Sequence, residues 1–392
     1  MPSPVPERPG LLIRDPFRYT DAMVIIPPVL VRCLQFFDGE QTDLDLRAEL
    51  VRLTGQLDVS QIQEHLAGTL SASGFLEDDV FARMRDRCRR AFEESPVRAA
   101  AHAGYAYPAE VDELRATLRR YMNGTGEPPA AVPNLAGIAA PHVSPEGGWE
   151  AYRAAYGALG PGYRDRTFVI LATSHYGEPE RFGLTRKAFA TPLGQTPTDT
   201  RLVDELDRAG GPAVQMEDFC HSFEHTAELQ VVFLQHLFGP DIRILPVMCG
   251  QFARSIYGGG RPEDDEGVRR FLDALGELAA REGDRLLWVL GIDMAHIGKR
   301  YRDEFEATAG EGIMSVVEQR DRERIARVAA GDTDAYWSLV QEEQDDLKWC
   351  GSSPLYTFLR AVPEARGTLL RYQQWNIDPA SVVSFAGMTF TR

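Results

Sequence analysis

The sequence predicts an α/β fold with a mostly parallel central sheet flanked by helices, preceded by a small separate domain. Short apolar segments such as Thr167–Ala172 and Arg285–Ile292 have the continuous hydrophobicity of strands that are buried on both faces. Longer amphipathic segments lie between them, and strands that alternate with helices form parallel sheets covered on both sides. The hydrophobic fraction of 44% and the charged fraction of 26% are those of a globular protein with a large core.

Residues 1–95 are expected to form the small domain. A strand is expected within Phe17–Ile26, and a second short strand is expected to begin at Phe75. Between them the pattern predicts three helices, over residues 28–37, 43–53 and 61–71. Helices followed by a short β-wing are typical of a winged helix, so we predict that architecture. A further helix, Val80–Glu94, is expected to lead into the next domain.

The larger domain is expected to span residues 98–392. Its strands are expected near residues 135–140, 167–172, 243–248 and 285–292. Its helices are expected over residues 111–122, 148–159, 200–209, 222–238, 267–281, 302–318, 321–330 and 332–343. Residues 123–133 and 255–266 are rich in glycine or proline, so we expect loops there, the second an exposed insertion.

Composition and charge exclude several classes of protein. The formal net charge of −16 argues against a nucleic-acid partner, because it would repel the phosphate backbone. No apolar run approaches the roughly 20 residues that span a bilayer, and MPSPVPERPG lacks the basic start and apolar core of a signal peptide. The five cysteines are widely spaced and include no CxxC pair, which argues against a disulfide framework. We therefore expect a cytoplasmic protein.

Side chains that can bind a metal follow three of the predicted strands. His142 follows the strand that ends near Ala140, His175 follows the next strand, and Asp293 with His296 follows the strand near residue 290. Since ligands of open α/β sheets bind beyond the carboxyl ends of the strands, these side chains are expected to lie close together. Cys350, in a loop before a predicted helix, adds a thiol. Two imidazoles and a thiolate would make a metal site.

Each of these residues also has a simpler interpretation. A histidine after a strand is commonly structural, and Cys350 fits a small buried hydrophobic residue. His225 and Glu228 share a helix face, which suits either a surface ion pair or the wall of a pocket. Asp293 can orient an imidazole or accept a proton. The sequence alone leaves these alternatives open.

A series of ordered segments in residues 98–392 resembles the Memo family. The matching segments include "AGYAYPAEVDEL", "GIAAPHVSPEGGWEAYRAAYGAL", "FVILATSHYG", "HSFEHTAELQVVFLQHLFG", "GIDMAHIGKRY" and "CGSSPLYTFL". The resemblance implies a fold similar to that of class III extradiol (LigB-type) dioxygenases.

The resemblance also implies roles for individual residues. It places a metal on His142, His175 and Cys350. The family's Asp-x-x-His falls on Asp293 and His296, and its Glu-His…Glu falls on Glu224, His225 and Glu228. In place of the second histidine that often follows the Ser-His, this chain has Tyr176, so its pocket is expected to differ. The resemblance further implies partners of the AMMECR and radical-SAM types.

The segments "LVRCLQFFDGEQTDLDLRAEL" and "HLAGTLSASGFLEDD" are similar to the PqqD-like winged-helix family, whose members bind leader peptides. DNA binding is the other use of a winged helix. Residues 1–97 hold 11 arginines, no lysine and 16 acidic residues, a net charge of −5, which argues against DNA. A peptide ligand is therefore the better expectation.

Three functions fit this combination. The first is a redox or O2-activating enzyme that uses iron, Fe(II), or in second place copper, on a small-molecule or peptide substrate. In it His296 would act as an acid, a base or a hydrogen-bond donor near the metal, oriented by Asp293, with His225 and Glu228 beside them. The second is a metal-binding adaptor without enzymatic activity that partners a radical-SAM or peptide-modifying system. The third is a zinc hydrolase.

Overall fold

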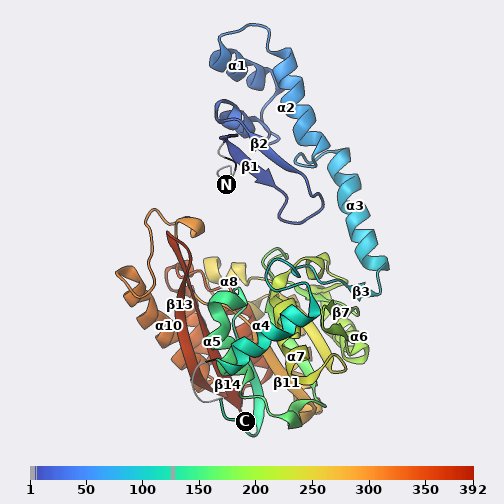
Figure 1. The fold of residues 1–392 in the computed structure, drawn as a ribbon, viewed down its shortest axis with the longest axis vertical. Helices are drawn as coiled ribbons and strands as arrows, with labels where there is room; N and C mark the ends of the chain where they lie inside the picture. Colours follow the sequence, from blue (N-terminus) through green and yellow to red (C-terminus); the bar gives the residue numbers. More distant parts are fainter. Residues whose placement is uncertain (1–4, 6, 125–128) are drawn as a thin grey trace. The chain divides into compact units, whose positions relative to one another are not determined.

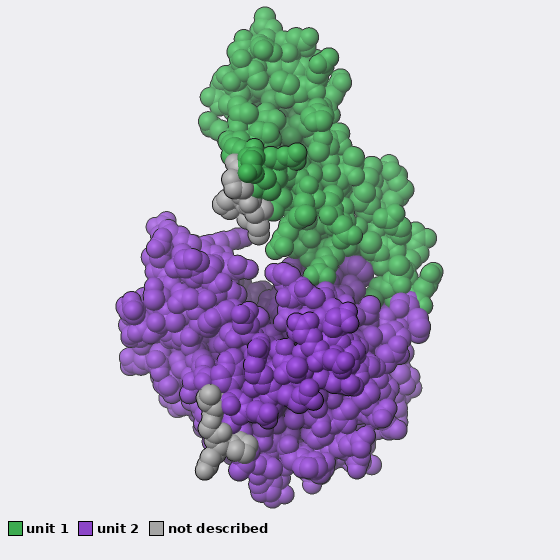
Figure 2. All heavy atoms as spheres, in the orientation of Figure 1, with its two compact units in different colours: residues 1–94 green, residues 95–392 purple. Residues whose placement is uncertain are grey.

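The computed structural model describes residue 5 and residues 7–124 and 129–392. Residues 125–128 of the expected loop lie outside the described residues. So do residues 1–4 and 6, which belong to the N-terminal segment that we expect not to be a signal peptide. The chain divides into two compact units, Met1–Glu94 and Ser95–Arg392, coloured separately in Figure 2. Among the helices of the described ranges, none has the length and apolar character needed to cross a bilayer.

The N-terminal unit consists of a β-hairpin followed by helices. Its elements are β1 (Leu11–Arg14), β2 (Met23–Ile26), the 3-10 helix η1 (Pro28–Phe36), α1 (Asp43–Thr54), α2 (Ser60–Ala72) and α3 (Asp79–Glu94). β1 and β2 pair antiparallel. A small core holds them together, made of the buried side chains Ile26, Cys33, Leu46, Leu50, Val59, Leu66 and Leu70.

The expected β-wing after the helices is wrong. Phe75 follows a turn at Gly74, where φ is +74°, and Asp78 then accepts the backbone N–H groups of Val80 and Phe81 at the start of α3. The chain therefore turns directly from α2 into α3, and the described part of this unit has strands only before its helices. The winged-helix architecture is not confirmed. The expected strand in residues 17–26 forms only over β2, because the Asp15 carboxylate holds residues 17–20 in a turn.

Four parallel strands form the centre of the larger unit. In spatial order they are β4 (Leu135–Ala140), β11 (Leu286–Gly291), β5 (Thr167–Thr173) and β10 (Arg243–Cys249). Almost all of their residues are buried, as expected for strands that are covered on both faces. The four strand predictions are confirmed to within one residue at each end, and the α/β fold class is confirmed with them.

Alternate residues of these strands contribute to two separate cores. Ile138, Phe168 and Ile170 point to one face, where they meet α4 (Val111–Asn123), α5 (Pro145–Tyr156) and α7 (His225–Phe238), which lie in front of the sheet in Figure 1. Val169, Leu171 and their neighbours on other strands point to the opposite face. The helices packed there include α6 (Thr200–Ala209), α9 (Glu266–Glu282), α10 (Ile313–Ala330), α11 (Thr333–Gln341) and α12 (Ser352–Ala361).

Further strands extend the sheet on both sides and make it mixed. On the β10 side lie β6 (Phe182–Leu184) and β9 (Val214–Met216). On the β4 side the long antiparallel strand β14 (Ser381–Thr391) pairs with β4, β12 (His296–Gly298) and β13 (Arg366–Asp378). A small separate sheet combines β3 (Val97–Arg98), β7 (Ala188–Thr191) and β8 (Gly194–Thr196). The sequence prediction had missed the two C-terminal strands.

Two other expectations for this unit need correction. The expected helices 302–318 and 321–330 are one helix, α10, which begins only at Ile313 because Gly310 and Gly312 have φ of +75° and +54°. Residues 255–266 are only in part the exposed loop that the sequence predicts: residues 257–261 are exposed, but Ser255, Ile256 and Pro262 are buried. They include the end of α8 (Ala253–Gly258) and a 3-10 turn, and the hydroxyl of buried Ser255 accepts the indole N–H of Trp337 at 2.6 Å.

Candidate metal centre

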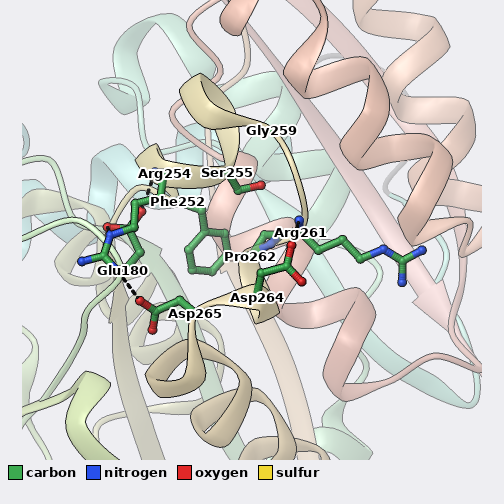
Figure 3. Close-up of a pocket in the computed structure, with 9 residues that line it drawn as sticks. All are labelled: Glu180, Phe252, Arg254, Ser255, Gly259, Arg261, Pro262, Asp264 and Asp265. Atoms are coloured by element: carbon green, nitrogen blue, oxygen red, sulfur yellow. Dashed lines mark hydrogen bonds and ion pairs between the residues drawn. The ribbon is translucent and has the colours of Figure 1, made fainter.

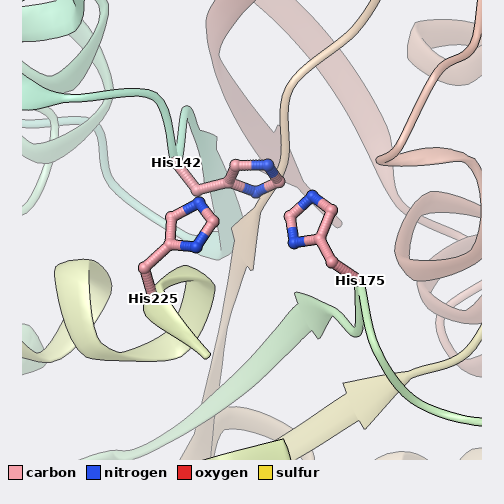
Figure 4. A group of neighbouring side chains, drawn as sticks. All are labelled: His142, His175 and His225. Atoms are coloured by element: carbon pink, nitrogen blue, oxygen red, sulfur yellow. The ribbon is translucent and has the colours of Figure 1, made fainter. Parts of the chain in front are cut away.

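Three histidines from three different segments meet beyond the carboxyl ends of the central strands. His142 follows β4 by two residues, His175 follows β5 by two residues, and His225 is the first residue of α7. Their ring centroids are 5.1 Å apart for His142 and His175, and 5.2 Å apart for each of the other two pairs. One ring nitrogen of each lies within 4.8 Å of the others, and Figure 4 shows the rings facing one another. The side chains thus converge on one point.

Two of the three rings are held by a hydrogen bond at Nδ1, and the third has an ion-pair contact there. The Nδ1 of His142 lies 2.9 Å from the carbonyl oxygen of Gly291. The Nδ1 atoms of His175 and His225 lie 3.1 Å and 2.9 Å from the same Glu224 carboxylate oxygen. Since these oxygens only accept, the Nδ1 atoms of His142 and His175 carry a proton, and Nε2 keeps its lone pair when the ring is neutral. That tautomer is the one in which Nε2 can bind a metal.

Cys350 brings its thiol to the same place. Its Sγ lies 3.2 Å from Nε2 of His142 and 3.6 Å from the carbonyl oxygen of Asp293. The loop is fixed from both sides, because Thr173 donates its hydroxyl to the Cys350 carbonyl at 2.9 Å and Gly351 donates its N–H to the Asp293 carbonyl at 3.1 Å. Burial raises the pKa of the Cys350 thiol, and the neighbouring His175 opposes that shift.

The charges within this cluster are unequal. Burial, followed by the neighbouring rings of His175 and His225, holds the pKa of His142 well below its usual range. Burial also disfavours the charged form of His175, but the carboxylate of Glu224 and the thiol of Cys350 outweigh it and raise the pKa of His175. Glu224 is buried, and the two imidazoles nevertheless lower its pKa. A carboxylate that carries its charge therefore lies directly behind two of the rings.

Asp293 joins the end of β11 to the end of β4. Its Oδ1 accepts the backbone N–H groups of His142 at 2.9 Å and Val143 at 3.2 Å, and its Oδ2 lies 3.5 Å from Nε2 of His142. Burial raises the pKa of Asp293 to about 7, although those two N–H groups favour the ionised form. The side chain thus fixes the backbone at His142 and lies beside its free nitrogen.

His296 is oriented by backbone carbonyls rather than by Asp293. Its Nδ1 donates to the carbonyl oxygens of Met294 at 2.8 Å and Lys348 at 3.0 Å. Its ring lies nearly perpendicular to that of Tyr301, with the two ring centroids 4.9 Å apart. Burial lowers the pKa of His296 to about 4, and the nearby charge of His175 adds to the effect. His296 is therefore a neutral imidazole whose Nε2 can accept a hydrogen bond. The expectation that Asp293 orients it is wrong.

Glu228 lies in a different environment from the other predicted site residues. Its carboxylate is fully buried and accepts hydrogen bonds from the Arg98 guanidinium, the Tyr107 hydroxyl, and the N–H groups of Ala101 and His102. These donors occupy both of its oxygens. The carboxylate that contacts His175 and His225 is that of Glu224, which the sequence analysis named only through the resemblance to the Memo family.

The cavity in Figure 3 contains none of the predicted site residues. It has a volume of 200 Å³ and is lined by Glu180, Phe252, Arg254, Ser255, Gly259, Arg261, Pro262, Asp264 and Asp265. Arg254 binds Asp265 at 2.6 Å, and the carboxylate of Asp264 accepts the N–H of Arg261 at 2.8 Å. Because its charged groups bind one another, we assign it a structural role.

Comparison with known proteins gives a consistent result. A family model described as "Memo-like protein" matches residues 98–389. A MEMO1 family protein of Aquifex aeolicus is 25% identical over 383 residues, which cover 97% of this chain and 95% of the relative. MEMO1 family proteins of Methanopyrus kandleri and Thermococcus kodakarensis are 26% and 27% identical, and the matches cover 75% and 76% of this chain and 99% and 100% of those relatives. The first match thus extends over the N-terminal unit as well.

Proposed function

The chain belongs to the Memo family, and from that premise we propose that its larger unit is a redox metal protein of the oxidoreductase class. We propose that His142, His175 and Cys350 hold one metal ion, with iron as Fe(II) first and copper second. The observation that carries the proposal is the convergence of three imidazoles, each with Nδ1 next to an acceptor oxygen, and of a thiol 3.2 Å from Nε2 of His142.

The donor set fits a transition metal. Imidazole nitrogen suits iron, copper and zinc, and thiolate sulfur favours copper and zinc while remaining compatible with iron. The rings are already oriented by the Gly291 carbonyl and the Glu224 carboxylate, so binding costs little rearrangement. Iron or copper held here would supply electron-transfer or O2 chemistry.

The residues around this donor set have distinct tasks. His142 is 2% exposed, whereas the side chains of His175 and His225 are 29% and 33% exposed, so the site opens on their side. On that side His225 would act either as a fourth metal ligand or as a base toward a bound substrate. His296 is neutral and fixed at Nδ1, which suits an acceptor of a substrate proton. Asp293, with a pKa raised to about 7, can hold or release a proton beside His142.

We propose that the N-terminal unit recruits the substrate or a partner as a peptide. A groove of 610 Å³ between β2 and α2 is lined by Val24, Ile25, Ile26, Pro27, Leu30, Gln61, Ile62, His65, Leu66 and Thr69. Most of these side chains are apolar, and the net charge of −5 over residues 1–97 favours basic over acidic ligands. A peptide of an AMMECR-type or radical-SAM partner would suit such a surface. DNA that bound tightly and dissociated with salt would contradict this part.

The experiment that tests the function measures metal content and O2 consumption of the full-length protein purified without added metal. Iron or copper together with substrate-dependent O2 consumption supports the oxidoreductase. A colourless protein filled with zinc that hydrolyses its substrate supports the zinc hydrolase instead. Stoichiometric metal without turnover, together with retained peptide binding, supports the adaptor. A protein that binds none of these metals contradicts all three.

A further inference from the structure

The larger unit begins with a segment, Arg98–Tyr107, that we call the strap. It starts in the small strand β3 and closes on itself, because the N–H of Gly104 donates to the carbonyl of Tyr107 at 2.7 Å. Both Arg98 and Tyr107 are buried, Arg98 completely. Arg98 lies 130 positions before Glu228 in the sequence, yet its side chain contacts Glu228 of α7 directly.

Glu228 ties the strap to α7. Its carboxylate accepts hydrogen bonds from Arg98 and Tyr107 side chains and from the N–H groups of Ala101 and His102, at 3.1 and 3.0 Å. Burial alone would raise the pKa of Glu228, but the charge of Arg98 outweighs it and lowers that pKa. A buried charge with this many donors is strongly held in one position.

The strap also binds the backbone turn that precedes α7. The Arg98 guanidinium donates to the carbonyl oxygens of His221 at 2.7 Å and Glu224 at 2.8 Å. The Nε2 of His102 donates to the carbonyl oxygen of Phe223 at 2.7 Å. Three carbonyls of residues 221–224 are thus bound by two strap side chains, and the turn has little freedom to move.

This turn carries two groups of the candidate metal centre. Glu224 orients the rings of His175 and His225, and His225 begins the helix directly after it. The ring of His102 lies 5.7 Å from the ring of His225, so the strap borders the cluster itself. A shift of the turn would therefore change the direction of two imidazoles at once.

We infer that Arg98 and His102 are positioning residues, which hold Glu224 and His225 in the geometry that the metal centre requires. The predicted effect on metal binding rests on the proposed function. The predicted effect on the position of residues 221–225 does not. The strap thereby has a role in the site, and Glu228 has the role of an anchor for the strap.

Two variants and one control test the inference. Arg98→Lys keeps a positive charge for Glu228, but a single ammonium group cannot reach the separate carbonyls that the guanidinium binds. His102→Phe keeps an aromatic ring at this position but removes the hydrogen bond to the carbonyl oxygen of Phe223. The control is Gln235→Leu, which removes a buried polar group at the other end of α7, where Gln235 binds Thr196 and Gly194.

The effect on the position of residues 221–225 is measured by hydrogen exchange on the metal-free, full-length protein. Both strap variants should speed exchange of amides 221–228 by at least about tenfold relative to the wild type, as expected for local opening. Gln235→Leu should leave these amides unchanged. Unchanged protection of residues 221–228 in both strap variants would overturn the inference.

The effect on metal binding is measured with Co²⁺ as an optical probe of the same proteins. The strap variants should bind Co²⁺ about 10–100-fold more weakly and with an altered visible spectrum, as for the loss of groups that orient metal ligands. Gln235→Leu should keep the affinity and the spectrum even if its melting temperature falls. A wild-type affinity and spectrum in both strap variants would overturn the inference. If the wild type itself binds no Co²⁺, the proposed function fails, and hydrogen exchange still decides the positioning role.

Discussion

The carboxylate of Glu224 binds His175 twice, accepting its backbone N–H at 2.9 Å and its ring Nδ1 at 3.1 Å. The same carboxylate accepts the N–H of His225 at 2.9 Å. One buried acid therefore sets both the backbone and the ring of a proposed ligand, and it determines which ring nitrogen faces the metal.

We predict that Glu224→Gln weakens metal binding by about 10–100-fold without unfolding the protein. Glutamine keeps one carbonyl acceptor and turns the other position into an amide donor, which then faces either the backbone N–H of His175 or the two ring Nδ1 atoms, so His175 loses a contact in both cases. Affinity is measured by competition with a chelator of known strength. An affinity equal to that of the wild type would show that the ring orientation does not depend on Glu224.

His296→Ala should separate a chemical role from a structural one. The ring is held by the carbonyls of Met294 and Lys348 and is neutral near pH 7, because its pKa lies at about 4. We expect the variant to keep its metal and its absorption spectrum and to lose about 10–100-fold in turnover or ligand binding. A lower melting temperature with unchanged turnover would indicate a structural histidine. A fall in metal affinity would indicate a further ligand.

Asp321 should make the stability of the larger unit depend on pH. Burial raises its pKa to about 6, although Ser384, Tyr372 and Trp349 donate hydrogen bonds to it. Between about pH 4 and pH 6 the folded protein keeps a proton that the unfolded chain has released. The free energy of unfolding therefore falls as pH rises, by at most about 1.4 kcal/mol per pH unit.

The variant Asp321→Asn tests that dependence. It should reduce the slope between pH 4 and 6, and it should also lower stability at pH 7 by about 1–3 kcal/mol because an acceptor is lost. Asp293, whose pKa is about 7, keeps part of the slope in the variant. Urea unfolding followed by tryptophan fluorescence reports this unit specifically, since all five tryptophans lie beyond residue 95. A slope identical to the wild type would contradict the raised pKa.

Gly351→Ala should disturb Cys350 through the backbone. A Cβ at position 351 would lie 2.7 Å from the Cβ of Ile292 and 2.8 Å from the carbonyl oxygen of Asp293. We expect a loss of about 1–3 kcal/mol in unfolding free energy together with weaker metal binding. The control is Gly276→Ala in α9, where the added Cβ meets nothing within 4 Å and helix propensity favours alanine by about 1 kcal/mol. Equal stability of the two variants would show that an added Cβ at position 351 does not clash with Ile292 and Asp293.

The sequence was sufficient for the central strands because their apolar runs are continuous. β13 lacked that signal, since its residues are half-buried or exposed and its polar side chains, such as Gln374 and Asn376, bind neighbouring loops. In α10, the pattern did not show that Gly310 and Gly312 delay the start of the helix. The four central strands could be predicted from their apolar runs, whereas β13 and the start of α10 depend on tertiary contacts.

The candidate site was only partly predictable for the same reason. Strand-end positions were enough to bring His142, His175 and Asp293 together. The anchor of His142 is the carbonyl of Gly291, a backbone group that carries no sequence signal. Helix spacing placed Glu228 near His225, but its partners come from the strap, which no local pattern connects to α7.

X-ray absorption of the iron-loaded, full-length protein tests the central claim most directly. The claim is that Cys350 and two histidines, His142 and His175, bind one metal ion. We predict one sulfur neighbour at about 2.3 Å and nitrogen neighbours at about 2.0–2.2 Å, as for thiolate and imidazole ligands. In Cys350→Ser the sulfur neighbour should be absent. A wild-type spectrum with only nitrogen and oxygen neighbours, or a sulfur neighbour that persists in Cys350→Ser, would contradict the claim.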